Sequence, residues 1–393
     1  MVVPESVIVE YFIDSTDKIA FLDVDVSFTG FGVLNRNQTA FGDYLNRVQL
    51  AGSSEAIAPL IEAIFALKEP LNLGTPFDSL SPEIYGSIHT NFQLTSRQLT
   101  EDLFTCKTSG DRRVITEGEC LWIDVAALGH NGDRTYEYFD FETSASAVSA
   151  GTQLNLGKQW YLAVAAGTSV YETASSVQPA MMNGSSNQAG IALKKSWGST
   201  DIGLSIVGGS GEFDAERFNI FPFGDRVTSE QEASFFGSSL RVSHDIDAGG
   251  GWYVRPMLDF GATRVKTQSF EETGAGALNL LVDASSQAYV TLNPAIEFGG
   301  EFKDNNLTIR PTVYLGYTHY LTDPSPATSA KLAGAPEVES FEVTSQGDRS
   351  IFDAAANVEL LFVNGVSMKL GYWGQFSRNT TVHGADFKMK FSF

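Results

Sequence analysis

The sequence DFKMKFSF at residues 386–393 decides the fold class of the chain. Apolar and polar side chains alternate along it, so an extended strand carries one kind on each face. The apolar row is Phe387, Met389, Phe391 and Phe393. The opposite row is Asp386, Lys388, Lys390 and Ser392. Such a strand predicts a sheet with lipid on one side and a polar interior on the other.

The same period of two extends upstream to about Cys120. It is clearest over residues 160–171, 252–262 and 307–320. Soluble β-sandwiches also alternate, but many of these strands exceed the usual length of about five or six residues. Length and alternation together favour strands that cross a membrane, each of which needs about 10 residues.

Turns and links of different length separate the strands. We expect short turns at residues 157–159, 198–199, 248–250, 303–306 and 364–365. We expect longer links at about 130–140, 173–186, 213–228, 268–282 and 321–348, and a shorter one near 378–382. Short turns on one side and long loops on the other are typical of outer-membrane barrels. The pattern predicts a 12-stranded antiparallel transmembrane β-barrel over residues 119–393.

Charged side chains on the polar face predict an aqueous lumen. A charge that faces lipid at mid-depth costs about 2–4 kcal/mol, so these side chains should point inward. The expected lumen-facing residues are Arg255, Asp259, Glu297, Arg310, Asp353, Glu359, Lys369, Asp386, Lys388 and Lys390. Many of their inward neighbours are Gly, Ala or Ser, which leaves room for a plug.

Four of the 5 tryptophans lie beside expected short turns or at the first strand. Trp160 and Trp252 follow such turns, Trp197 precedes one, and Trp122 opens the first strand. Indole rings settle at membrane–water interfaces. We therefore expect these four residues to form a girdle at the periplasmic interface.

Composition excludes several classes of protein. The net charge of −21 disfavours nucleic acid as a partner, because phosphates need a basic surface. No apolar run reaches the roughly 18 residues that suggest a membrane-spanning helix. The start, MVVPESVIVEYF, lacks the features of a signal peptide, so we expect a fragment of a longer precursor. No motif predicts a cofactor or a metal site.

The residues before the barrel fall into two zones. Within residues 1–34, VIVEYFID and IAFLDVDVSF favour short strands. Residues 35–118 show helical spacing instead. The expected helices are residues 37–50, 54–67 and about 82–105.

The third helix has the clearest start signals. Ser81 is the expected N-cap, Pro82 lies at the first helical position, and Glu83 favours the positive helix N-terminus. Its apolar row is Ile84, Ile88, Phe92, Leu99 and Leu103. Small or polar residues, and Arg97, cover the remaining surface. From its pattern alone, an ordinary surface helix is the alternative.

Two cysteines, Cys106 and Cys120, flank the segment between this helix and the barrel. An even number of cysteines in an exported protein favours a disulfide. In the chain-entropy model a loop of about 15 residues contributes roughly 3 kcal/mol. Metal binding is the alternative, although no histidine lies nearby in the sequence.

The chain resembles the C-terminal part of autotransporters, the monomeric type V secretion proteins. GTQLNLGKQWYLAVAAGTSVY at 151–171 is similar to the second and third barrel strands of that family. LNRNQTAFGDYLNRVQLAG at 34–52 and LSPEIYGSIHTNFQLTSRQL at 80–99 are similar to its segment between passenger and barrel. The closing Phe393 matches the aromatic C-terminus of the family.

The resemblance implies a translocator that inserts in the outer membrane of a Gram-negative bacterium and passes its own passenger to the cell surface. Residues 82–105 would then be a pore helix that plugs the lumen, within a helical linker at 35–118. Residues 1–34 would be the β-helix-like end of the passenger. The implied partners are lipid, lipopolysaccharide, periplasmic chaperones and the barrel assembly machinery, which reads the row from Phe387 to Phe393.

Two details of that resemblance concern the helix. Its polar face is expected to meet lumen charges such as Arg255, Asp259 and Glu297. Family members that cut their passenger inside the barrel carry an Asn-Asn pair in the helix, whereas only Asn91 lies there in this chain. Intrabarrel self-cleavage is therefore not expected, and the passenger either stays attached or is cut by another protease.

Two other functions compete with translocation. A porin-like channel for small solutes is the main rival, and the helical segment at 35–105 argues against it. A barrel enzyme is the second rival, and His130 with Ser or Asp of the long loops is its test site. The five histidines do not cluster in the sequence, so we expect no enzyme.

Overall fold

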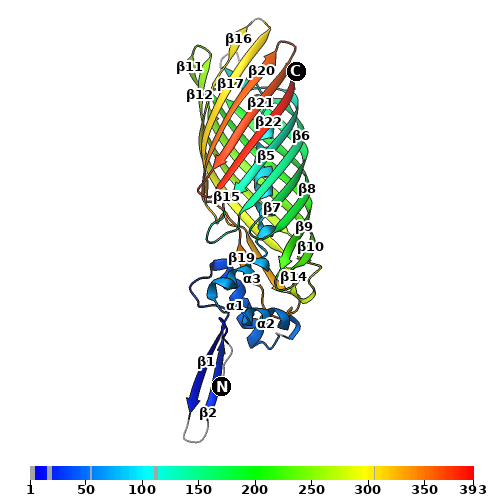
Figure 1. Cartoon of the computed structure of the whole chain (residues 1–393). Helices are drawn as coiled ribbons and strands as arrows, with labels where there is room; N and C mark the ends of the chain where they lie inside the picture. Colours follow the sequence, from blue (N-terminus) through cyan, green and yellow to red (C-terminus); the bar gives the residue numbers. More distant parts are fainter. Residues whose placement is uncertain (1–4, 16–19, 54, 110–113, 305) are drawn as a thin grey trace.

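A β-barrel fills one end of the molecule, and helices with short strands fill the other (Figure 1). The computed structural model describes residues 5–15, 20–53, 55–109, 114–304 and 306–393. Within these residues, twelve antiparallel strands surround the lumen. They are β5 (Cys120–Gly132), β6 (Phe141–Gly157), β7 (Trp160–Ser175), β8 (Ala180–Trp197), β9 (Thr200–Ile220), β10 (Asp225–His244), β12 (Trp252–Thr267), β15 (Ser285–Gly300), β17 (Leu307–Tyr320), β20 (Ser350–Phe362), β21 (Val366–Phe376) and β22 (Thr380–Ser392).

Two strand pairings close the barrel. β22 pairs with β5, which places Phe391 opposite Leu121, and β10 pairs with β12. β11 (Ile246–Gly249) and β16 (Phe302–Asp304) extend the sheet beside the short turns. The predicted 12-stranded closed barrel is therefore confirmed.

Two links that were expected to be long are short turns between very long strands. Only four residues separate β7 from β8, at 176–179, and four separate β9 from β10, at 221–224. The expected links at 173–186 and 213–228 are therefore wrong. β9 has 21 residues, well beyond the roughly 10 of a membrane crossing. Strand ends that project past the lipid can be polar on both faces, which gives them the sequence character of a loop.

The two longest links carry secondary structure of their own. They form a four-stranded sheet, which we call the loop sheet, in the order β13 (Phe270–Glu271), β14 (Leu280–Val282), β18 (Ala327–Leu332) and β19 (Phe341–Thr344). The 3-10 turn η4 (Gly276–Leu278) lies between β13 and β14. The helices before the pore helix are α1 (Arg36–Leu50), η1 (Glu55–Ile57), α2 (Ala58–Phe65), η2 (Pro70–Leu73) and α3 (Gly74–Ser79). They lie at the same end of the molecule as this sheet, and α1 packs on it through β19 (Figure 1).

We call these helices and the loop sheet the cap. α1 begins with a capping box between Asn35 and Gln38. Its buried face places Phe41 and Tyr44 against Phe341 of β19, at ring-centroid distances of 5.1 and 5.2 Å. The cap therefore has an apolar core shared between the chain before the barrel and the loops of the barrel.

The N-terminal strands form a hairpin. β1 (Val9–Ser15) and β2 (Ala20–Val26) pair in antiparallel fashion, with Val9 opposite Val26. Two strands were expected here, but successive coils of a β-helix pair in parallel. The sequence between them, 16–19, is far shorter than the crossover of a dozen or more residues that parallel strands need. β1 and β2 are therefore a hairpin rather than two successive coils, and the assignment of residues 1–34 to the end of a passenger stays a prediction.

The third expected helix begins as the 3-10 turn η3 (Glu83–Gly86) and continues as α4 (Ser87–Leu103). The side chain of Ser81 forms no cap, and Pro82 precedes the first turn. The predicted cap is therefore wrong. The main-chain oxygen of Ser81 instead accepts a hydrogen bond from Gln178 at 2.6 Å, so contacts with the barrel set the start of the helix.

A short hairpin, β3 (Lys107–Ser109) with β4 (Ile115–Glu117), follows α4. Among the described residues, none of the helices has the length and apolarity that a membrane-spanning helix requires.

Candidate functional site

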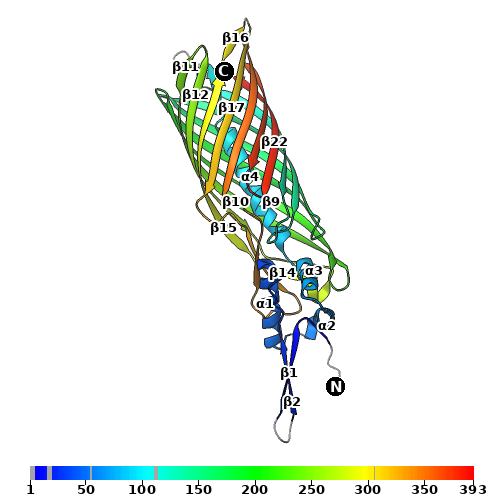
Figure 2. The ribbon, with the colours of Figure 1, turned by 60° about the vertical axis from the view of Figure 1, so that its left-hand side comes forward.

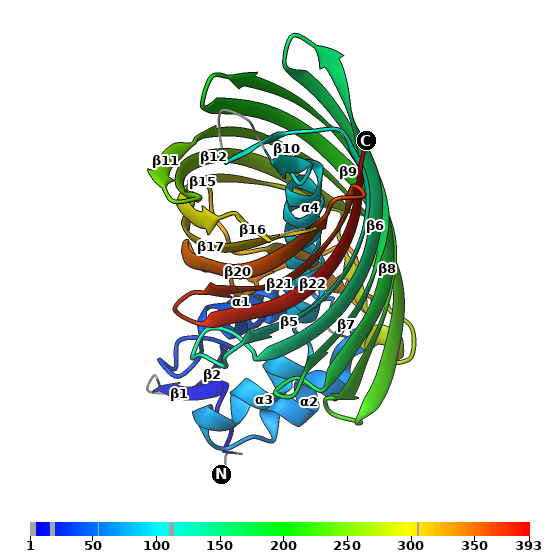
Figure 3. The ribbon, with the colours of Figure 1, turned by 90° about the horizontal axis from the view of Figure 1, so that it is seen from above.

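The lumen holds α4 along its length (Figures 2 and 3). The helix runs from the cap toward the end of the barrel that carries the short turns and the C-terminus. In outer-membrane barrels the short turns are periplasmic, so the cap lies on the extracellular side. α4 contacts β6 to β10 and β12 most closely.

The apolar row of the helix packs on one wall. Phe92 lies 5.5 Å from the ring of Phe213 and 5.0 Å from that of Phe235. Ile88, Leu99 and Leu103 are also buried. Of the other expected helix residues, Ile84 and Pro82 are buried where the chain enters the barrel.

Glycines in this wall allow the close approach of the helical segment. A Cβ on Gly237 would lie 2.3 Å from Oγ of Ser96, and one on Gly203 would lie 2.4 Å from the ring of Phe104. Neither distance is compatible with a side chain larger than hydrogen unless the neighbour moves. Neither contact could be predicted from the sequence, because a glycine in a strand does not by itself indicate what it contacts.

The polar side of the helix faces the opposite wall. Arg97 forms an ion pair with Asp353 of β20 at 2.9 Å. Tyr320 of β17 donates a hydrogen bond to Oε1 of Gln93 at 2.9 Å. This side joins the helix to the wall through directed polar contacts rather than through apolar packing.

Two acidic residues near the end of α4 bind strand cations. Glu101 pairs with Arg241, which also pairs with Asp259 at 2.6 Å. Asp102 is buried and pairs with Lys388 at 2.8 Å. Glu101, Asp102 and Arg241 were not among the predicted site residues. Arg241 lies opposite Asp259 in the register between β10 and β12. This register is the signal that could have indicated the Arg241–Asp259 pair.

The ten expected lumen residues all lie away from the exposed outer face. Arg255, Arg310, Asp353, Asp386, Lys388 and Lys390 are buried, and Asp259, Glu297, Glu359 and Lys369 are half-buried. Several pair with each other between strands. These pairs are Lys369 with Asp386 at 2.9 Å, Arg310 with Glu359 at 2.8 Å and Lys390 with Glu359 at 2.6 Å.

The expected contact of the helix with Arg255 and Glu297 is wrong. Arg255 pairs with Asp245 at 2.5 Å and with Glu297 at 2.9 Å, both from strands or turns of the barrel. Asp259 reaches the helix only through Arg241. These charges neutralise one another along the wall, which removes the need for a partner on the helix.

The tryptophan girdle has three of its four expected members. Trp160, Trp197 and Trp252 are exposed on the outer face, but Trp122 is buried, with the Lys388 ammonium 5.0 Å from its ring centroid. The placement of Trp122 in the girdle is therefore wrong. It shares the inward face with Asp124, and the period of two along β5 determines its direction.

A buried ion pair fixes the chain where it enters the barrel. Arg217 of β9 and Glu272 of the β13–β14 link are both fully buried, 2.7 Å apart. Tyr85 donates a hydrogen bond to Glu272 at 2.5 Å, and Arg217 donates another to the main-chain oxygen of Ser79 at 2.7 Å. This group could not be predicted from the sequence, because its members are far apart along the chain.

Glu83 joins three segments at the extracellular end of the barrel, where the chain enters the lumen. Its carboxylate accepts hydrogen bonds from Asn37 of α1 at 3.0 Å and from the main-chain N–H of Phe139 at 2.9 Å. Asn37 also exchanges hydrogen bonds with the main chain of Thr344 in β19. Burial raises the pKa of Glu83 to about 8.

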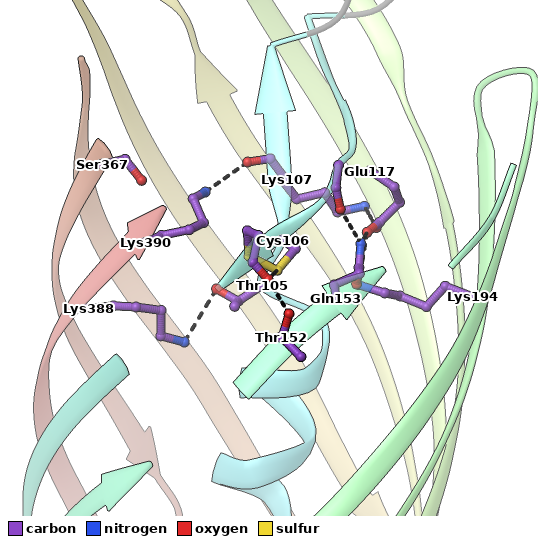
Figure 4. Close-up of a disulfide and its surroundings, with 12 residues drawn as sticks. Thr105, Cys106, Lys107, Glu117, Thr152, Gln153, Lys194, Ser367, Lys388 and Lys390 are labelled. Carbon is purple, nitrogen blue, oxygen red and sulfur yellow. Dashed lines mark hydrogen bonds and ion pairs between the residues drawn. A yellow bond between two sulfur atoms is a disulfide. The ribbon is translucent and has the colours of Figure 1, made fainter. Parts of the chain in front are cut away.

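A disulfide joins Cys106 to Cys120 inside the periplasmic half of the lumen (Figure 4). Both residues are buried. The bond ties the end of the helical segment to the first residue of β5. The described part of the chain shows no group of three or more His, Cys, Asp or Glu side chains that could hold a metal ion. His130, the test site of the enzyme hypothesis, is buried with its ring 4.7 Å from that of Phe141.

Comparison with known proteins identifies the family of the barrel. The family model described as Autotransporter beta-domain matches residues 121–373. No curated protein sequence matches the chain.

Solved structures share the fold. The translocator domain of the autotransporter NalP from Neisseria meningitidis has a TM-score of 0.64 at 12% identity, covering 79% of this chain and 99% of that one. The β domain of the Bordetella autotransporter BrkA has a TM-score of 0.53 at 13% identity, covering 70% and 100%. The transport unit of AIDA-I from Escherichia coli has a TM-score of 0.53 at 11% identity, covering 76% and 97%. The chain belongs to the autotransporter β-domain family, and its barrel is the outer-membrane translocator domain of a Gram-negative bacterial autotransporter.

Proposed function

We propose that the barrel passes the chain N-terminal to α4 to the cell surface, and that α4 then stays in the lumen as a plug. The observation that carries this proposal is the path of the chain. It runs from the β1–β2 hairpin and the cap, on the extracellular side, through the lumen as α4 to the first barrel strand. A porin-like channel needs no such segment.

The cap gives the exported chain a defined position. α1 packs on the loop sheet through Phe41 and Tyr44, and Asn37 pairs with the main chain of β19. Residues 1–34 are, in this proposal, the end of the passenger, held above the barrel by residues 35–80. The proposal assigns the chain a role in transport and no reaction.

The outward row of β22 is, in this proposal, the assembly signal. Phe387, Phe391 and Phe393 are exposed on the outer face, with Met389 half-buried between them. These residues are accessible to the barrel assembly machinery while the last strand still lacks lipid. Deleting Phe393 should lower the amount of heat-modifiable barrel in outer membranes, and normal assembly after the deletion contradicts this role.

Surface labelling of intact cells tests the export step. An epitope inserted at Gly32, where a positive φ and free space mark an open turn, should bind antibody on intact cells. The matched control is the same epitope at Gly250, an equally open turn at the periplasmic end. It should bind antibody only after the outer membrane is permeabilised. The reverse result, or labelling of both sites only after permeabilisation, contradicts the proposed function.

A further inference from the structure

The plug helix leaves part of the lumen unfilled. A cavity of about 290 Å³ lies beside the C-terminal half of α4, and one of about 80 Å³ lies closer to the cap. Leu94, Arg97 and Gln375 line both cavities. Polar space therefore follows one side of the helix toward the periplasmic end, where the larger cavity is also lined by Lys107 and Glu117.

The residues between α4 and β5 lie across the lumen at that end. We call β3, β4 and the disulfide Cys106–Cys120 the strut. Its two strands pair with each other, Lys107 opposite Glu117, and the main-chain N–H of Gly118 donates to the oxygen of Cys106 at 3.0 Å. The segment is thus closed on itself by one covalent bond and by main-chain hydrogen bonds (Figure 4).

Charged side chains hold the strut to the wall formed by β6, β8 and β9. Lys107 pairs with Asp201 at 3.0 Å and with Glu117 at 2.5 Å. Glu117 also pairs with Lys194 at 2.8 Å and accepts a hydrogen bond from Gln153 at 2.9 Å. Glu117, Lys194 and Gln153 are buried, so water competes little for these contacts.

Other side chains hold the strut to the opposite wall. Lys390 of β22 donates a hydrogen bond to the main-chain oxygen of Lys107 at 2.8 Å, and Arg310 of β17 donates to the same oxygen at 3.5 Å. The two cations pair with Glu359 of β20. The strut therefore contacts both sides of the lumen, which a loop that merely connected α4 to β5 would not need.

We propose that the strut is a second closure of the barrel, separate from α4, that blocks the space beside the helix at the periplasmic end. The proposal rests on the plugging of the lumen proposed above. The disulfide keeps the strut compact, and the ion pairs keep it across the lumen. Loss of either feature allows the strut to swing aside while α4 stays in place.

Single-channel recordings of the full chain in planar bilayers test this closure. Two variants are compared: Cys106→Ser with Cys120→Ser, which removes the covalent link, and Glu117→Gln, which keeps the disulfide but removes two ion pairs. Each should raise the conductance of the channel in a discrete step. The matched control is Glu119→Gln, because Glu119 bonds the main-chain N–H of Asn155 outside this network and its loss should change nothing.

Heat-modifiability on gels first shows which variants have assembled. Unchanged conductance in an assembled variant of either kind overturns the proposal. Should neither variant assemble, addition of dithiothreitol to the assembled chain decides, with the same expected step. Arg97→Ala, which releases the helix from Asp353, separates the two closures. If it raises the conductance and the strut variants do not, the helix plug stands and the strut fails. If Arg97→Ala leaves the conductance unchanged, the proposed plugging of the lumen by α4 loses support.

Discussion

The two ends of the lumen are closed by different chemistry. At the extracellular end, the cap rests mainly on an apolar core that buries Phe41, Tyr44 and Leu45, with the buried Arg217–Glu272 pair below it where the chain enters the barrel. In the periplasmic half of the lumen, ion pairs such as Lys388 with Asp102 join the helix to the barrel wall. An apolar core loses stability in proportion to the volume removed from it, whereas a buried ion pair depends on having both partners. The same class of substitution should therefore have different effects at the two ends.

Removing one partner of the buried pair in the lumen should have the largest effect. Lys388→Met leaves Asp102 without its cation in a buried site, which costs about 3–5 kcal/mol. The midpoint of heat-induced unfolding on gels should fall. Replacing both partners, Lys388→Met with Asp102→Leu, should restore most of the loss, because no unpaired charge then remains. Equal destabilisation by the single and double variants contradicts the assigned ion pair.

A cavity in the cap should act locally. Leu45→Ala removes a fully buried side chain of α1, which costs about 2–5 kcal/mol in a packed core. The cap should become sensitive to protease while the heat-modifiability of the barrel stays the same. Leu50→Ala, in the same helix but 88% exposed, is the matched control and should change neither property. Joint loss of barrel stability indicates that cap and barrel unfold as one unit.

The smallest expected effect, at most about 3 kcal/mol between pH 6 and 8, is a pH dependence of the cap. The pKa of Glu83 rises from 4.5 to about 8 when burial desolvates it, so the docked cap holds a proton that the undocked cap releases. The packing of the cap around Glu83 is then most stable below pH 4.5. Its free energy of unfolding falls as the pH rises toward 8, by at most about 1.4 kcal/mol per pH unit. Asp78, whose pKa burial raises to about 6, adds the same trend at lower pH.

Protease sensitivity of the cap at pH 6 and at pH 8 measures this dependence. The cap should be cut faster at pH 8. Glu83→Gln, which keeps the shape and stays neutral, should flatten the difference. A difference of the same size in the variant shows that another group carries it.

The barrel could be predicted from the sequence because its signal is local. The direction of Lys388 and Phe387 follows from the period of two, and the same period applied to β5 would have placed Trp122 inward. The apolar row of α4 is also readable from spacing. The start of the helix was predicted wrongly, since Ser81 has the right residue type for a cap but contacts with Gln178 override it.

The rest depends on contacts between distant residues. Arg217 and Glu272 lie 55 positions apart, and nothing in the sequence near either one indicates the other. The loop sheet escaped prediction because its strands are as short as two residues, too short for a period to appear. The ends of β7 to β10 were predicted as loops because these strands are longer than a membrane crossing. Their ends extend past the lipid, so they carry no apolar row.

The most direct test of the plug is the conductance of a chain that lacks residues 82–105, which include η3 and α4. The single-channel conductance of this variant in planar bilayers should exceed that of the full chain, because the helix no longer occupies the lumen. Deletion of residues 9–26, the β1–β2 hairpin outside the barrel, is the control and should leave the conductance unchanged. An unchanged conductance after deletion of 82–105, in a barrel that still shows heat-modifiability, contradicts the account of α4 as the plug.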